Sequence, residues 1–207
     1  MRRFGCLLLF LMGCILARAQ FYIGLRDSKY AVAGYQWNSG WQVQLDQSIF
    51  EANLRSQYIR GGGGFQFYHN RYFDFMASAF AGTTYCNNFY DLGARIDGSY
   101  LPLKWLELDA GINPRYDSDY GYETTYLVGL KFHINDEIAL LSQYSTIPEY
   151  RISEKRARLG LQFKVKNLAV TPMISVPVKG NTLNLRILVG LKYEFITQRY
   201  LNRKNSN

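Results

Sequence analysis

The sequence predicts an all-β fold, in which antiparallel strands follow one another in an up-and-down order and close into a barrel. Three observations support this prediction: apolar and polar residues alternate with period two, a glycine-led segment recurs, and aromatic residues gather near the expected strand ends. Between residues 20 and 195 the sequence lacks the three- and four-residue apolar spacing, with capping signals, that is typical of amphipathic helices.

The first nineteen residues have the pattern of a cleavable signal peptide. A basic start at Arg2 and Arg3 precedes an apolar run over residues 4–16, and residues 17–19 read Ala-Arg-Ala. Small residues at these positions are accepted by signal peptidase, so we expect cleavage after Ala19. The apolar run is short for a transmembrane helix. A lipoprotein signal ending at Cys14 is the alternative, although Met12 fits that motif poorly.

The basic character of the chain lies mostly outside the predicted barrel, residues 20–195. The formal net charge is +8, from 24 Lys and Arg against 16 Asp and Glu. Six of the cations lie in the signal peptide or in the tail, residues 196–207, which leaves 18 cations against 16 carboxylates in the barrel. We therefore expect no nucleic-acid partner. Cys86 is the only thiol after cleavage, so no disulfide within the chain is expected.

Five segments show the alternation most clearly, and each predicts a strand with one apolar face and one polar face. They are residues 90–100, 106–113, 125–134, 156–165 and 182–195. In the last segment the apolar positions are Leu183, Leu185, Ile187, Val189, Leu191, Tyr193 and Phe195.

A repeat of roughly thirty residues sets the predicted strand number. Its glycines are Gly34, Gly64, Gly98, Gly129, Gly160 and Gly190, and the segment at Gly98 is the most degenerate. Short turns follow, near residues 38–40, 69–70, 102–103, 135–136 and 166–167, whereas longer connections are expected at 84–88, 114–122 and 145–154. Six hairpins predict twelve strands. Ten or eight are the alternatives, if residues 21–26 or the poorly alternating residues 48–63 do not pair.

The distribution of charge and of aromatic residues predicts that the barrel crosses a membrane. Charged residues occupy the polar faces of the strands, and the apolar faces carry almost none. Aromatic residues flank both the short and the long connections, as expected for the two interfaces of a bilayer. A secreted β-sandwich is the alternative, but its outer faces would meet water and tolerate charge.

This pattern resembles the outer-membrane β-barrel proteins of Gram-negative bacteria. The sharpest local likeness is the last strand, where Gly190, Tyr193 and Phe195 resemble the C-terminal targeting signal of that class. Leu188 departs from the signal, and the tail continues beyond Phe195. The resemblance implies an outer-membrane location with both chain ends in the periplasm. It also implies outer-membrane lipids, periplasmic chaperones and the barrel assembly machinery as partners.

Charged side chains on the polar faces are the candidate functional residues. The predicted lumen charge network is Asp91, Arg95, Asp97, Glu107, Asp109, Arg158, Lys164 and Arg186. We expect Arg95, Arg158 and Arg186 to face the acidic residues of this set and to neutralise them. Such a lumen is either a narrow polar pore, with a small polar solute as partner, or a plug of ion pairs.

The sequence predicts no catalytic site, metal or cofactor. The two histidines, His69 and His133, lie near predicted short turns, and no Gly-x-Ser-x-Gly motif is present. The acidic residues of segment 114–122 do not follow the EF-hand spacing for calcium. Four glycines at 61–64 precede a strand pattern rather than a helix, so a phosphate loop is not expected. We therefore predict a non-catalytic barrel with a pore, structural or surface-interaction role. An outer-membrane lipid-modifying hydrolase is the alternative.

Overall fold

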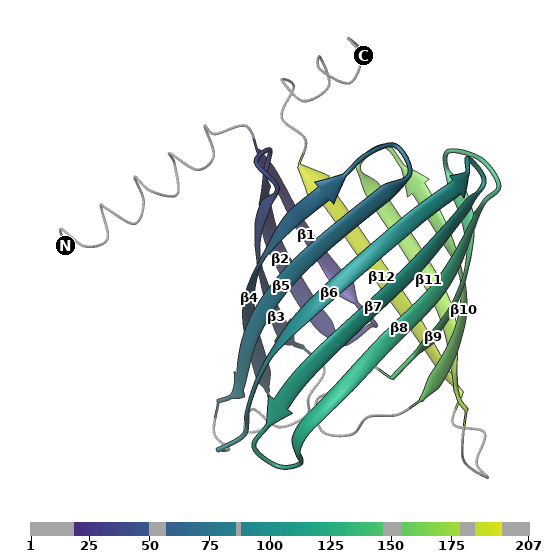
Figure 1. Cartoon of the computed structure of the whole chain (residues 1–207). Coiled ribbons are helices and arrows are strands. Elements are labelled where there is room, and N and C mark those ends of the chain that lie inside the picture. Colours follow the sequence, from purple (N-terminus) through teal and green to yellow (C-terminus); the bar gives the residue numbers. More distant parts are fainter. Residues whose placement is uncertain (1–18, 50–56, 86–87, 147–154, 179–184, 196–207) are drawn as a thin grey trace.

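The chain forms a closed antiparallel β-barrel (Figure 1). The computed structural model describes residues 19–49, 57–85, 88–146, 155–178 and 185–195. The strands in these ranges are β1 (Ala19–Arg26), β2 (Tyr30–Trp37), β3 (Trp41–Ser48), β4 (Tyr58–His69), β5 (Phe73–Thr84), β6 (Tyr90–Leu103), β7 (Leu106–Asp117), β8 (Gly121–His133), β9 (Ile138–Ser145), β10 (Arg156–Val165), β11 (Leu168–Pro177) and β12 (Arg186–Phe195). No helix among the described residues is long and apolar enough to cross a membrane.

Each strand pairs with its neighbour in sequence, and β12 closes the barrel against β1. The closing register places Phe21 opposite Phe195 and Leu25 opposite Leu191. The prediction of twelve strands is therefore confirmed, including the short first strand, which pairs on both sides. The β-sandwich alternative is wrong, because a closed circuit of strands has no two sheets to stack.

The two faces of the wall differ sharply in charge. Every Asp, Glu, Lys and Arg within the twelve strands lies at one of the alternate positions that face the interior of the barrel. We call this side of the wall the lumen face. The opposite face carries exposed apolar side chains such as Ile187, Val128 and Leu159, which are 73%, 55% and 55% exposed. An apolar exterior around a charged interior is the arrangement that a bilayer requires of a β-barrel.

Aromatic rings form pairs near both ends of the wall. At the end with the short turns, the rings of Phe73 and Tyr100 stack with centroids 4.5 Å apart. At the other end, Tyr90 lies 6.2 Å from Tyr116 between ring centroids. Two such bands on the lipid-facing side are expected where the wall passes the two interfaces of the bilayer.

The prediction of a long connection over residues 114–122 is wrong. β7 continues through Pro114 to Asp117, β8 begins at Gly121, and only residues 118–120 connect them. The carboxylate of Asp117 closes this turn, because its Oδ1 accepts the backbone N–H groups of Asp119 and Tyr120. Gly121 takes a φ of 80°, which few other residues adopt. The short turn predicted at 102–103 lies at residues 104–105 instead.

Two of the recurring glycines, Gly34 and Gly98, make room for neighbouring rings, and they differ in the face of the wall on which they lie. A Cβ at Gly34 would lie 2.2 Å from the ring of Tyr22, which lines the lumen, so a side chain at this position would displace that ring. A Cβ at Gly98 would instead meet the ring of Phe75, in the aromatic band outside the barrel. The glycine of the degenerate segment therefore lies on the lipid-facing side.

Candidate functional site: the barrel lumen

The lumen contains a cavity of about 620 Å³, lined by side chains from strands all around the barrel. Its lining includes seven cations, Arg26, Lys29, Arg60, Arg95, Arg115, Arg158 and Lys192. It also includes four carboxylates, those of Asp27, Asp46, Asp91 and Asp97. Most of the remaining lining is glycine, glutamine, tyrosine or small apolar residues. The lining of the cavity therefore has more positive than negative groups.

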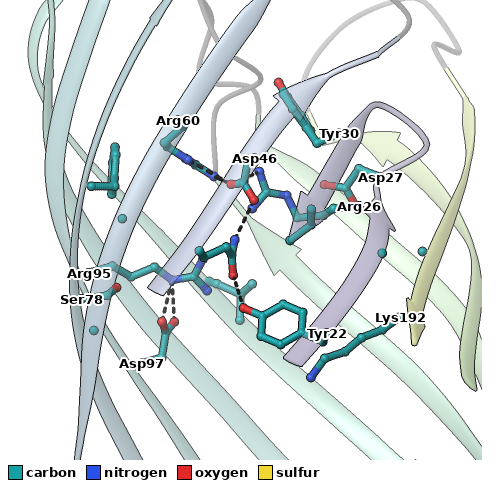
Figure 2. A pocket seen from close by; sticks show the side chains of 18 of the residues that line it. Tyr22, Arg26, Asp27, Tyr30, Asp46, Arg60, Ser78, Arg95, Asp97 and Lys192 are labelled. Atoms are coloured by element: carbon teal, nitrogen blue, oxygen red, sulfur yellow. Dashed lines mark hydrogen bonds and ion pairs between the residues drawn. The ribbon is translucent and has the colours of Figure 1, made fainter. Parts of the chain in front are cut away.

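A buried carboxylate on β3 joins two arginines, one from the neighbouring strand β4 and one from β1 (Figure 2). Asp46 Oδ2 lies 2.7 Å from the NH2 group of Arg60 and 3.0 Å from that of Arg26. Only 2% of the Asp46 side chain is exposed. The register places Asp46 beside Arg60, and β1 brings Arg26 from the other side of β2. One carboxylate between two guanidinium groups leaves this cluster with a net positive charge.

The same cluster continues along the wall toward β12. The hydroxyl of Tyr22 donates to Gln44 Oε1 at 2.8 Å, and Gln44 Nε2 donates to Asp46 Oδ1 at 2.7 Å. Lys192 Nζ lies 4.7 Å above the ring of Tyr22 and 2.8 Å from Glu194 Oε1. This chain of contacts holds the polar side chains of β1, β3, β4 and β12 in place.

A second cluster, on β6–β8, has the opposite composition. The guanidinium group of Arg115 lies 2.7 Å from Asp117, 3.5 Å from Glu123 and 3.6 Å from Asp91. The side chains of Arg115, Asp117 and Asp91 are almost completely buried. Asp91 also accepts the hydroxyl of Tyr58 at 2.6 Å. Three carboxylates around one guanidinium leave a net negative charge. No group of three potential metal ligands is arranged to hold an ion among the described residues.

The predicted lumen charges lie on the lumen face, but their partners differ from expectation in several cases. Arg95 Nε contacts Asp97 at 2.7 Å, as expected. Arg158 lies 3.5 Å from Asp27, in the β1–β2 turn, and not against the carboxylates of β7. On β7, Asp109 accepts the hydroxyl of Ser99 at 2.7 Å.

The remaining members of the predicted network lie outside the lining of the cavity. Glu107 Oε2 lies 3.4 Å from Lys131 Nζ and 2.9 Å from His133 Nε2. Lys164 and Arg186 share the lumen faces of β10 and β12 with residues that do line the cavity. Arg186 is far along the strand circuit from Glu107 and Asp109 and does not neutralise them as predicted.

Four residues that sequence reasoning did not single out organise the two clusters: Arg26, Asp46, Arg60 and Arg115. The signal that would have found Asp46 was available, because Gln42, Gln44 and Asp46 alternate with apolar residues through β3. Arg115 was placed in the predicted loop. Without the register between strands, no pattern in the sequence shows which cation meets which carboxylate.

An aromatic cluster lies beside these charges at the end of the barrel with the long connections. Tyr58 and Phe89 are each 2% exposed, and Tyr30 is 9% exposed. The rings of Tyr30 and Phe89 meet that of Tyr58 edge-on, with centroids 6.5 and 6.2 Å away. Tyr30 and Tyr58 line the cavity, so this cluster forms part of its wall.

The residues of the predicted targeting signal divide between the two faces of β12. Gly190 lines the cavity, whereas the rings of Tyr193 and Phe195 contact each other with centroids 4.8 Å apart. Phe195 also meets Phe21 of β1, 5.4 Å between centroids, across the closing strand pair. Leu188, the departure from the signal, is 5% exposed on the lumen face.

A closed twelve-strand barrel with a charged lumen and an apolar exterior defines the chain as a β-barrel of the bacterial outer-membrane type. No protein-family model and no curated protein sequence matches it. Among solved structures it is similar to the KdgM porin, alone and in complex with disordered oligogalacturonate. Both matches have a TM-score of 0.63 at 10% identity, over 86% of this chain and 98% of that chain. It is also similar to the NanC porin, with a TM-score of 0.49 and 11% identity over 85% and 97% of the two chains. The likeness to KdgM is one of fold.

Proposed function

We propose that the protein is an integral outer-membrane protein that forms a narrow, non-catalytic channel for small polar solutes. The observation that carries this proposal is the cavity of about 620 Å³ inside the closed barrel, whose lining includes seven cations and four carboxylates. A purely structural barrel would have an interior packed with side chains, as small barrels do. The predicted signal peptide, residues 1–19, lies outside the described residues except for Ala19 and supplies the export route.

The lining of the cavity favours anions over cations. Its seven cations outnumber its four carboxylates, so the potential inside is positive, and a positive lumen raises the local concentration of anionic solutes. The KdgM porin, whose fold the chain shares, was solved in complex with an oligogalacturonate. An acidic sugar is accordingly one class of solute to test.

The contacts of the two histidines support a non-catalytic role. His69 is largely exposed and lies 3.7 Å from Asp74, while His133 contacts Glu107. Both residues end a strand at the rim with the short turns, which faces the periplasm in barrels of this type. A hydrolase acting on surface lipids would need its base at the opposite rim. Membrane lipids around the apolar exterior and the barrel assembly machinery during biogenesis complete the proposed partners.

Single-channel recording in planar bilayers tests the channel. The purified barrel is expected to give stepwise conductance and, in a KCl gradient, a reversal potential that reports a modest preference for chloride. Leu141→Trp, on the lumen face and in the cavity lining, is expected to lower the conductance. Leu140→Trp, one residue away on the opposite face of β9, is the matched control and should leave it unchanged. Absence of conductance in correctly folded protein would show a plugged or purely structural barrel.

A further inference from the structure

The charges of the lumen are separated around the barrel. The lumen faces of β5–β8, which we call the acidic wall, carry seven carboxylates, Asp74, Asp91, Asp97, Glu107, Asp109, Asp117 and Glu123. Three cations share that wall: Arg95, Arg115 and Lys131. The lumen faces of β9–β12 and β1–β4, which we call the basic wall, carry seven cations, Arg26, Arg60, Arg156, Arg158, Lys164, Arg186 and Lys192. Only Asp46 and Glu194 share that wall.

We infer that this separation produces an electric field across the lumen, and that the field makes the channel favour small zwitterions over neutral solutes of equal size. The inference rests on the proposed channel function. The formal charges of the described strands are −4 on the acidic wall and +5 on the basic wall. Because the total is only +1, the field arises from where the charges lie and not from the net charge of the lumen.

The ion pairs within each wall leave the net charge of that wall with the same sign. On the acidic wall, Arg115 is shared by three carboxylates, and Asp109 accepts a hydroxyl group. On the basic wall, Asp46 is shared by two guanidinium groups. Pairing within each wall therefore does not cancel the difference between the walls.

The topology places the opposite charges across the lumen from each other. In a circuit of twelve strands, β1 lies six strands from β7, and β12 lies six strands from β6. Arg26 on β1 is thus on the far side of the barrel from Arg115 and its three carboxylates. Lys192 on β12 is likewise across from β6, which carries Asp91 and Asp97. Over the full height of the wall, a passing solute has an excess of carboxylates on one side and of cations on the other. In the lining of the cavity itself, the acidic wall contributes two carboxylates and two cations, and the basic wall contributes the excess of cations.

A zwitterion is the solute class that can use both sides at once. Its carboxylate is attracted to the basic wall and its ammonium group to the acidic wall, and each attraction is stronger in a narrow lumen than in bulk water. An anion gains only at one wall and is repelled at the other. A neutral solute of the same size carries no charge that the field could orient. Salt near 1 M weakens the effect, because at that concentration it screens charges separated by more than about 3 Å.

The isomers β-alanine and lactamide provide a matched pair of probes, since they share one formula but only the first is a zwitterion. Their entry rates into proteoliposomes are compared by osmotic swelling at low salt. The native channel is expected to admit β-alanine about two-fold faster or more, relative to lactamide, and 1 M KCl should reduce the ratio toward one.

Two double variants separate the field from the net charge. Asp109→Asn with Arg158→Gln removes one charge from each wall, whereas Glu107→Gln with Lys131→Gln removes an ion pair within the acidic wall. Both leave the net charge of the lumen unchanged, but only the first weakens the separation. The β-alanine to lactamide ratio is expected to fall in the first variant and to remain in the second. Folding of each is checked by its heat-dependent gel mobility.

The results that overturn this inference differ from those that overturn the channel. Equal entry of the two isomers into native proteoliposomes, or an equal fall of the ratio in both double variants, would exclude the transverse field and leave the channel standing. If neither isomer enters, the channel itself is wrong. Should a double variant not fold, the salt dependence of the ratio in the native protein decides the question by itself.

Discussion

Asp46 and Arg60 face each other across the β3–β4 pair, with carboxylate and guanidinium atoms 2.7 Å apart and the carboxylate almost completely buried. Arg26, which lies on β1, has a guanidinium nitrogen 3.0 Å from the same carboxylate. Asp46 therefore connects three strands of the wall. It is also one of only two carboxylates on the basic wall, so it limits the positive potential there.

Replacing Asp46 by Asn should lower stability and raise the preference for anions. The two guanidinium groups would then lie close together without the negative charge that offsets their repulsion. We expect this to lower the free energy of unfolding by about 1–3 kcal/mol in a lumen that admits water. The temperature at which the folded band disappears on gels should fall, and the reversal potential should shift toward chloride. Asp27→Asn is the control, because Asp27 has a longer 3.5 Å contact with Arg158 in a turn. Equal losses in the two variants would contradict a special role for Asp46.

The fold was predictable from the sequence because each of its determinants is local. Alternation in a strand such as β10, the spacing of the glycines and the aromatic residues at strand ends all follow from neighbouring residues. The turn after β7 was missed because Pro114, followed by polar residues and Gly121, is typical of a loop. There the Asp117 side chain and the φ of Gly121 allow a three-residue turn that composition does not reveal.

The pairing of charges was less predictable, because it depends on register and on the order of strands around the barrel. Arg158 and Asp109 lie on lumen faces as alternation implies, yet β8 and β9 separate their strands. The sequence shows a nearly balanced set of charges, and only the closed circuit shows that opposite signs are gathered on different walls. Long-range position, not residue type, determines the electrostatics of this lumen.

Gly82, on the lumen face of β5, and Gly61, on the outer face of β4, offer a direct test of packing around Tyr58. A Cβ at Gly82 would lie 2.2 Å from the Tyr58 hydroxyl and 2.5 Å from Asp91, whereas a Cβ at Gly61 would meet nothing within 4 Å. Gly82→Ala should destabilise the barrel by about 1–3 kcal/mol, since the Tyr58–Asp91 hydrogen bond must move. Gly61→Ala should be close to neutral. Urea unfolding in detergent measures both, and a neutral Gly82→Ala would contradict the packing around Tyr58.

Adjacent residues of β8 test which face of the wall meets lipid. Val128 is 55% exposed on the apolar side, and Leu127 lines the cavity. Val128→Arg places a charge in the hydrocarbon region and should cost about 2–4 kcal/mol near the middle of the bilayer. Leu127→Arg points into the polar lumen and should assemble almost normally. The amount of folded barrel recovered in lipid vesicles compares them. If Leu127→Arg were the more damaging variant, the assignment of faces would be reversed.

The last strand carries the predicted targeting signal, which can be separated from its structural role. Phe195 packs against Phe21 and Tyr193, so Phe195→Ser removes both a ring contact and the terminal apolar residue of the signal. We expect a lower proportion of the protein in the outer membrane of expressing cells. Phe21→Ser breaks the same ring contact from β1 and leaves the signal intact, so it should reduce stability more than targeting. Comparison of membrane fractions with refolding yields in vesicles distinguishes the two effects. If both variants reach the membrane equally, Phe195 acts through packing against β1 and not through recognition by the assembly machinery.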